Sequence, residues 1–240
     1  MPYYVAPTND VEKHAFLNTV LDTAKKDMDK GNIYMNQQTV DAIEALLPEY
    51  TQAISDVQSK LGARSKEVLE GNEALSKLEL YIRDMWDGLR RRTIRMNHPA
   101  KILTEYGLPL NGLTPRPNRN SEWLTIGATI IKGEANAIAE GFPPISNPSV
   151  EELQAVLETA GKETGEAAIA DRVYDEAQEA LAVLRVKVDA LVGKTRRDLE
   201  YFLFDRDDAS RRRIMRTYGI KFKYLPDEPQ EEDDTLTDES

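Results

Sequence analysis

Residues 54–89 read ISDVQSKLGARSKEVLEGNEALSKLELYIRDMWDGL. Apolar or small residues recur in this stretch at spacings that alternate between three and four, and polar residues interrupt the pattern at Ser65 and Asn72. The positions of this seam are Ile54, Val57, Leu61, Ser65, Val68, Asn72, Leu75, Leu78, Ile82, Met85 and Leu89. Such spacing over about five heptads is typical of a long helix that packs on another helix. We predict a helix from Glu49 to Arg95, about 70 Å long if unbroken, with Gly62 as the expected break.

The first half of the chain resembles the second half when it is shifted by 110 residues. Phe16 then falls on Ile126, Val20 on Ile130, and Gly31 on Gly141. Near the end of each half a Tyr-Gly pair recurs, at 106–107 and at 218–219. A fixed internal period indicates that one structural unit is present twice. We therefore predict repeat 1 at 9–112, a linker rich in Gly, Pro and Asn at 113–118, and repeat 2 at 119–226.

Each repeat is expected to hold three helices. In repeat 1 the first helix starts at Asn9 or Asp10 and stops near Gly31, and a second covers about 38–47. Pro48 is expected to end or kink this second helix before the long helix begins. In repeat 2 the first helix is capped by Ser121, and a short helix follows from Asn147-Pro148 or from a capping box of Ser149 and Glu152. Gly161 and Gly165 weaken the start of the last long helix, which we place near Glu166.

The two ends of the chain differ from its helical body. Residues 1–8 are expected to be an extended strap because Pro2 and Pro7 oppose helix. The stretch YGIKFKYL at 218–225 alternates apolar and basic residues, which predicts a short strand or strap. The tail 227–240 holds eight acids and no base, so most of the net charge of −11 belongs to it, and we expect it to be disordered.

Composition excludes several protein classes. The chain has no cysteine, so disulfides and thiolate metal sites are absent. It shows neither a signal peptide nor an apolar run of about 18 residues, which predicts a cytoplasmic protein or a component of a particle without membrane contact. The fold prediction is all-α: two tandem copies of a three-helix unit, each with one long coiled-coil-like helix, forming an elongated bundle with a short extended strap near the C-terminus.

Catalytic motifs are not found, and we expect no catalytic residue, no cofactor and no metal. His14 and His98 lie outside any spacing that would place two ligands on one helix face, and a structural or solvent role is expected for both. The string LVGKT at 191–195 lacks the leading glycine of a phosphate loop. Acidic residues such as Glu163, Glu166 and Asp171 are expected to form a solvated helix face.

Arginine clusters are the best candidates for a binding site. The candidate residues for a polyanion or a partner are Arg90, Arg91, Arg92, Arg95, Arg211, Arg212, Arg213, Arg216, Lys221 and Lys223. They are dense enough to contact phosphate. The first interpretation, however, is ion pairing within the protein, for example with Asp205, Asp207 and Asp208, or pairing with the acidic tail of the same or a neighbouring copy.

The sequence favours a non-enzymatic structural or interaction protein. A long amphipathic helix that extends beyond the helices packed on it within the chain leaves part of its apolar face uncovered, and this part must pack on another helix. The expected partners are therefore the protein itself or other helical proteins of an assembly. Binding of nucleic acid or another polyanion is the alternative. The two Tyr-Gly pairs are expected to be structural, and Tyr3, Tyr4, Phe142, Trp86 and Trp123 are expected to fill the core or protomer seams.

Overall fold

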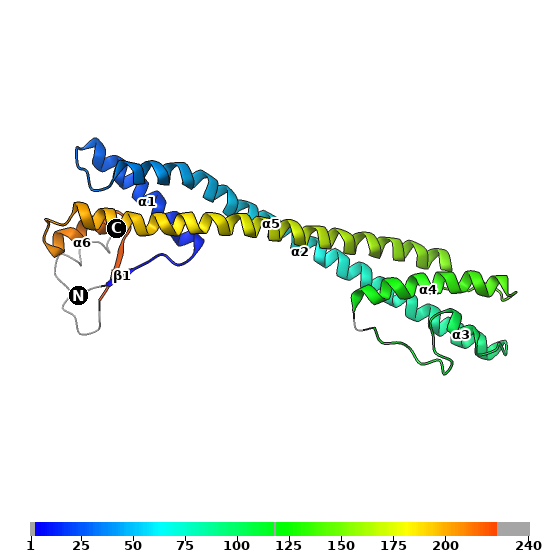
Figure 1. The fold of residues 1–240 in the computed structure, drawn as a ribbon. Helices are drawn as coiled ribbons and strands as arrows, with labels where there is room; N and C mark the ends of the chain where they lie inside the picture. The colour runs from blue at the N-terminus through cyan, green and yellow to red at the C-terminus, as the bar shows by residue number, and fades with distance from the viewer. Residues whose placement is uncertain (1–2, 118, 225–240) are drawn as a thin grey trace. The chain divides into compact units, whose positions relative to one another are not determined.

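The computed structural model describes residues 3–117 and 119–224, and within this part the fold is all-α with one small sheet (Figure 1). The elements are β1 (Tyr3–Val5), α1 (Asp10–Asp29), α2 (Gln37–Arg95), α3 (Ile102–Glu105), α4 (Asn120–Ala139), α5 (Val150–Phe202), α6 (Asp208–Thr217) and β2 (Lys221–Lys223). In α1 to α3 a long helix is followed by the longest and then by a short one, and α4 to α6 repeat this order of lengths. The predicted tail 227–240 and residue 118 of the predicted linker lie outside the described residues.

Helix starts follow the expected capping chemistry at most positions. The Asn9 side chain accepts a hydrogen bond from the backbone N–H of Glu12 at 2.9 Å, which fixes the start of α1. The Glu152 carboxylate accepts from the N–H of Ser149 at 2.8 Å, and the Ser149 hydroxyl accepts from the N–H of Glu152 at 3.2 Å. This reciprocal pair is the predicted capping box of α5. The predicted cap at Ser121 is wrong, because α4 already begins at Asn120.

The first long helix is continuous through Pro48, where we expected a short helix to end or kink, and through Gly62, where we expected a break. A proline inside a helix removes one backbone hydrogen bond. Here Leu46, Leu47 and Tyr50 on both sides of Pro48 are buried, and their burial holds both flanking turns in the core. At Gly62 the cost is only about 1 kcal/mol relative to alanine, which is too small to break a helix of this length.

The second long helix is also one helix rather than two. It runs from the capping box through Gly161 and Gly165, so the predicted start near Glu166 is wrong. Leu153, Val156 and Ala160 are buried on the turns before these glycines. Packing of these turns therefore outweighs the local helix propensity of the two glycines.

By packing, the chain divides into two compact units. Unit 1 comprises Met1–Ser59 and Asp175–Ser240, and unit 2 comprises Lys60–Tyr174. Each unit therefore joins part of one sequence half to part of the other, with segments of both α2 and α5 in each. The predicted repeats describe recurrence along the sequence, whereas these units describe packing.

Unit 1 packs α1 and α6 on the first turns of α2 and the last turns of α5. Its fully buried side chains include Leu17, Ile43, Val188 and Leu199. An ion pair links the two sequence halves, because the Arg185 guanidinium donates to both carboxylate oxygens of Asp10, at 2.9 and 2.7 Å.

The two ends of the described chain meet in unit 1. β1 pairs antiparallel with β2, with Tyr3 opposite Lys223, Tyr4 opposite Phe222 and Val5 opposite Lys221. The expected extended segment near the N-terminus and the expected strand in 218–225 are thereby confirmed.

Unit 2 packs α3 and α4 on the last turns of α2 and the first turns of α5. Leu78, Ile82, Met85 and Leu89 of the predicted seam are fully buried here, with Trp86 beside them. Helix α4 passes close to α3: a Cβ placed on Gly133 would lie 2.0 Å from the carbonyl oxygen of Glu105. Glycine is therefore required at this crossing.

The two Tyr-Gly pairs have the structural role that the sequence predicts, with one pair in each unit. Gly107 and Gly219 adopt positive φ angles of 72° and 80°, and the tyrosine before each glycine is buried. Gly107 approaches Thr129 on α4 in unit 2, and Gly219 approaches Thr19 on α1 in unit 1. Thr19 and Thr129 are 110 positions apart, so the same contact recurs at the sequence period.

None of the helices in the described ranges combines the length and apolar character that a membrane crossing requires.

Candidate functional site

The arginines at the end of α2 all belong to unit 2, and they serve the fold to different degrees. Arg90 holds the loop that follows α3, because it donates to the carbonyl oxygen of Gly112 at 2.7 Å and to the Thr114 hydroxyl at 2.8 Å. It also pairs with Asp87 at 2.6 Å. Arg92 donates to the carbonyl oxygen of Pro143, whereas Arg91 and Arg95 remain exposed on the surface.

The basic residues of α6 and β2 all belong to unit 1. Arg211 pairs with Asp208, as one of the expected ion pairs. Arg212 is buried, and Arg216 lies over the ring of Phe222, 5.8 Å from its centroid. Arg213, Lys221 and Lys223 are exposed. Pairing within the protein thus accounts for Arg90 and Arg211, while phosphate binding by these clusters remains a prediction.

Both histidines make local contacts. Nε2 of His14 lies 2.8 Å from the hydroxyl oxygen of Thr51, and the ring of His98 meets Phe142 edge-on with centroids 4.8 Å apart. These contacts match the structural role that the sequence indicates.

A stretch of the predicted seam in unit 2 remains uncovered. Leu61 is 42% exposed and Val68 is 37% exposed, and the seam residues Ser65 and Asn72 are exposed as well. Leu69, next to Val68, is 59% exposed and widens the apolar stripe. We call Leu61, Ser65, Val68, Leu69 and Asn72 the exposed seam.

Helix lengths explain why the seam emerges here. The part of α2 in unit 2 has 36 residues, from Lys60 to Arg95, and is about 54 Å long at 1.5 Å per residue. Helix α4 has 20 residues and is about 30 Å long. The seam from Leu75 to Leu89 shares one apolar core with α4 residues such as Ile130 and Ala137, whereas in the described ranges Leu61 and Val68 belong to no apolar core.

Next to the exposed seam, α2 contacts α5 through small and charged residues. A Cβ on Gly71 would lie 3.5 Å from the carbonyl oxygen of Glu163, so the backbones are close at this point. Arg64 pairs with Asp171, and its guanidinium lies 5.2 Å from the centroid of the Tyr174 ring. Polar contacts therefore replace the apolar core in this part of unit 2.

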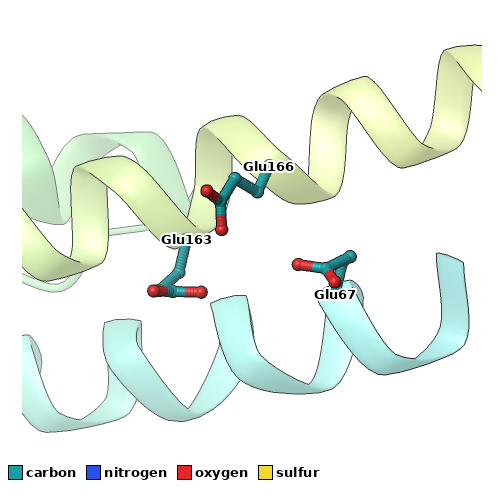
Figure 2. Close-up of side chains that lie close together, drawn as sticks. All are labelled: Glu67, Glu163 and Glu166. Carbon is teal, nitrogen blue, oxygen red and sulfur yellow. The ribbon is translucent and has the colours of Figure 1, made fainter. Parts of the chain in front are cut away.

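An acidic cluster lies on the same pair of helices. Figure 2 shows Glu67 of α2 facing Glu163 and Glu166 of α5, and one carboxylate oxygen from each lies within 4.8 Å of the others. Sequence reasoning placed Glu163 and Glu166 on a solvated face and did not connect them with Glu67. Lysines already approach these acids: Lys66 lies 3.4 Å from Glu67, and Lys162 lies 3.4 Å from Glu163.

These lysines balance the charge of the cluster. Hydrogen bonds to Glu70 and Glu67 raise the pKa of Lys66, and a hydrogen bond to Glu163 raises the pKa of Lys162. Both ammonium groups thus remain charged well into the alkaline range. The cluster is a mixed network of lysine and glutamate, and its geometry alone does not assign a metal.

Three buried tyrosines donate their hydroxyl protons to carboxylates. In unit 1, Tyr50 donates to Asp10 at 2.8 Å and Tyr218 donates to Asp27 at 2.9 Å. In unit 2, Tyr106 donates to Glu134, which is itself buried and also accepts from the N–H of Ile145 at 2.6 Å. Burial first, and the carboxylate second, raise the pKa of each tyrosine far above its ordinary value of 10.0.

These tyrosines make the folded state sensitive to alkali. A raised pKa means that the folded state keeps the proton more tightly than the unfolded state, so the stabilisation is complete below pH 10 and is lost as the pH rises above it. We expect the free energy of unfolding to fall steadily above about pH 10, when the unfolded tyrosines ionise. Urea unfolding followed by circular dichroism at increasing pH measures this fall. A constant free energy of unfolding between pH 9 and pH 11 would contradict the assignment.

A groove of about 620 Å³ lies in unit 1, where the end of α5, helix α6 and the small sheet meet. Its aromatic lining comes from Tyr3, Tyr4, Phe204 and Phe222. The arginines that line it are Arg196, Arg211 and Arg212, and its acids are Glu200 and Asp208. We call it the β1–α6 groove.

Sequence reasoning named Arg211 and Arg212 as binding candidates and Asp208 as an ion-pair partner, but it did not connect them with the aromatic residues of the groove. It expected Tyr3 and Tyr4 to fill the core or a protomer seam, yet Tyr3 is 48% exposed beside the groove. Tyr4 and Phe222 lie opposite one another in the sheet, so strand pairing brings aromatic residues from both ends of the chain together. The only signal for this groove in the sequence is the alternation of apolar and basic residues in 218–225.

Comparison with protein families, with curated proteins and with solved structures finds no match for this chain.

Proposed function

We propose that this chain is a non-enzymatic structural or interaction protein that associates with a second copy of itself through the exposed seam. The observation that supports the proposal is the exposure of Leu61, Val68 and Leu69 on a helix whose next turns bury the same pattern at Leu75, Leu78 and Ile82. Removing apolar surface from water yields roughly 25 cal/mol per Å², so an uncovered seam favours association with another helix. We place the resulting assembly in the cytoplasm or within a particle.

The charges beside the seam support a second copy as the partner. Along α2 the basic residues Lys60, Arg64 and Lys66 come first, and the acidic residues Glu67, Glu70 and Glu73 follow. An antiparallel copy centred between Lys66 and Glu67 places Lys60 opposite Glu73 and Lys66 opposite Glu67 of its partner. The same arrangement satisfies the two-fold symmetry of a dimer, in which each contact occurs twice.

Existing ion pairs do not oppose this arrangement. The pairs of Lys66 with Glu67 and Glu70, at 3.4 and 3.3 Å, are exposed to solvent. Exposed pairs contribute about 0–1 kcal/mol, so exchanging them for pairs between copies costs little. Specificity then comes from charge pattern, and affinity comes from the apolar positions.

The apolar part of the proposal is tested by the double substitution Leu61→Glu and Val68→Glu. We expect the wild-type chain to sediment as a dimer and this variant as a monomer, because each copy would bury two carboxylates in the interface between the helices. Leu80→Glu is the matched control, since Leu80 is 56% exposed on the same helix but lies outside the seam. A wild-type chain that sediments only as a monomer would refute self-association.

The antiparallel register is tested by charge reversal. Lys60 and Glu73 are both exposed, and they face each other between copies in this register. Lys60→Glu alone and Glu73→Lys alone each bring like charges together and should weaken the dimer. An equimolar mixture of the two variants restores opposite charges at both contacts and should recover the dimer. Failure of the mixture to recover it would exclude this register.

A further inference from the structure

The β1–α6 groove contains both kinds of side chain that bind single-stranded nucleic acid, namely aromatic rings and arginines. Phe204 is 76% exposed and Tyr3 is 48% exposed, so both rings present accessible faces. Aromatic faces of this kind stack on unpaired bases without regard to sequence. The groove volume of about 620 Å³ also falls within the range of sites that hold one drug-sized ligand, and a nucleotide unit is of that size.

Arginine supplies the second element. Arg196 lies over the ring of Tyr4, with its guanidinium 4.9 Å from the ring centroid, and Arg211 lines the same groove from α6. Arg196 pairs with Glu200 at 2.7 Å, and Arg211 pairs with Asp208. Both pairs are partly exposed and join neighbouring turns of one helix, so a phosphate can replace either carboxylate at small cost.

The surrounding segment is basic although the whole chain is acidic. Residues 194–223 hold ten lysines and arginines against five acids, while the whole chain has a net charge of −11. The positive charge is therefore concentrated where the aromatic residues lie. One further group in the groove lacks a partner: within the described ranges, the buried hydroxyl of Tyr4 makes no hydrogen bond.

We propose that the β1–α6 groove binds single-stranded nucleic acid, with bases stacked on Tyr3 and Phe204 and phosphates held by Arg196 and Arg211. Duplex is disfavoured because its bases are already stacked and cannot reach the rings. An acidic peptide could satisfy the arginines but would leave the aromatic faces unused. This proposal stands independently of self-association, since it concerns unit 1 and the exposed seam belongs to unit 2.

The experiment uses the full-length chain and a fluorescein-labelled oligothymidine, with binding followed by fluorescence anisotropy at low salt. Loss of one stacked base in Phe204→Ala should weaken binding about tenfold. Tyr201→Ala is the matched control, because Tyr201 is 77% exposed in the last turn of α5, shortly before Phe204, and does not line the groove. Its affinity should equal that of the wild-type chain.

A second pair of variants tests the phosphate contact. Arg196→Gln should reduce the slope of log affinity against log salt by about 0.7, the value for one phosphate contact to a single strand. Arg197→Gln should leave the slope unchanged, because Arg197 is exposed next to Arg196 but does not line the groove. Equal effects of the two substitutions would show a diffuse charge effect and overturn the assignment of the groove.

Three further outcomes would overturn the proposal. These are absence of oligothymidine binding at low salt, equal or tighter binding of a duplex of the same length, and displacement of oligothymidine by polyglutamate at equal charge concentration. The last result would identify an acidic protein as the ligand class. Circular dichroism of each variant establishes that its fold is intact.

Discussion

Gly133→Ala is expected to destabilise unit 2 by about 3 kcal/mol or more, because overpacking against rigid backbone is among the most costly single changes. The new Cβ would lie 2.0 Å from the carbonyl oxygen and 2.6 Å from the carbonyl carbon of Glu105. These are backbone atoms, so no rotamer change relieves the contact. The turn after α3 is also held in place, since the indole N–H of Trp86 donates to the carbonyl oxygen of Tyr106 at 2.9 Å.

Tryptophan fluorescence during urea unfolding measures this loss in unit 2 alone, because both tryptophans of the chain, Trp86 and Trp123, lie in that unit. Gly62→Ala is the control. A Cβ on Gly62 meets no atom within 4 Å, and alanine favours helix over glycine, so this variant should gain up to about 1 kcal/mol. Equal unfolding midpoints for Gly133→Ala and the wild-type chain would contradict the close crossing of α3 and α4.

Trp86→Ala is expected to cost unit 2 about 3–5 kcal/mol, the usual range for removing a buried large aromatic side chain. The Trp86 side chain is 1% exposed, and its ring centroid lies 6.4 Å from that of Trp123. Truncation leaves a cavity and also deprives the carbonyl oxygen of Tyr106 of its donor. The same indole therefore supports the core and the Tyr-Gly turn.

Trp123 remains in this variant and reports the unfolding of unit 2. Leu80→Ala is a suitable control, because the exposed Leu80 side chain contributes little to the core and its truncation should change the free energy of unfolding by less than about 0.5 kcal/mol. If Trp86→Ala were no more costly than Leu80→Ala, the packing of unit 2 around the indole would be wrong.

The sequence predicts the helical fold well where local chemistry acts alone. The caps at Asn9 and Ser149, and the structural role of the two Tyr-Gly pairs, depend on residues within a few positions of one another. It fails at Pro48, where local preference predicts an end. Burial of Tyr50 and its neighbours depends on residues far away in the chain and overrides that preference.

The candidate sites are less accessible to sequence reasoning for the same reason. Arg90 is part of a dense basic run, but its bonds to Gly112 and Thr114 depend on the path of a loop. The β1–α6 groove needs Tyr3 and Phe204, which are about 200 positions apart. The sequence does hold a signal for the acidic cluster, because KEVLE at 66–70 resembles KETGE at 162–166. Only the packing of the helices, however, shows that these two segments face each other.

The division into units has a consequence for the order of events during translation. Unit 2 is one uninterrupted stretch, Lys60–Tyr174, whereas unit 1 is made of two stretches separated by all of unit 2. Every residue of unit 2 is therefore synthesised before the end of α5, α6 and β2. Domains fold as units once their residues have emerged, so unit 2 can complete its core on the nascent chain. Helix α1 and the strand β1 are made first, but the core of unit 1 is complete only when the end of α5, α6 and β2 have followed.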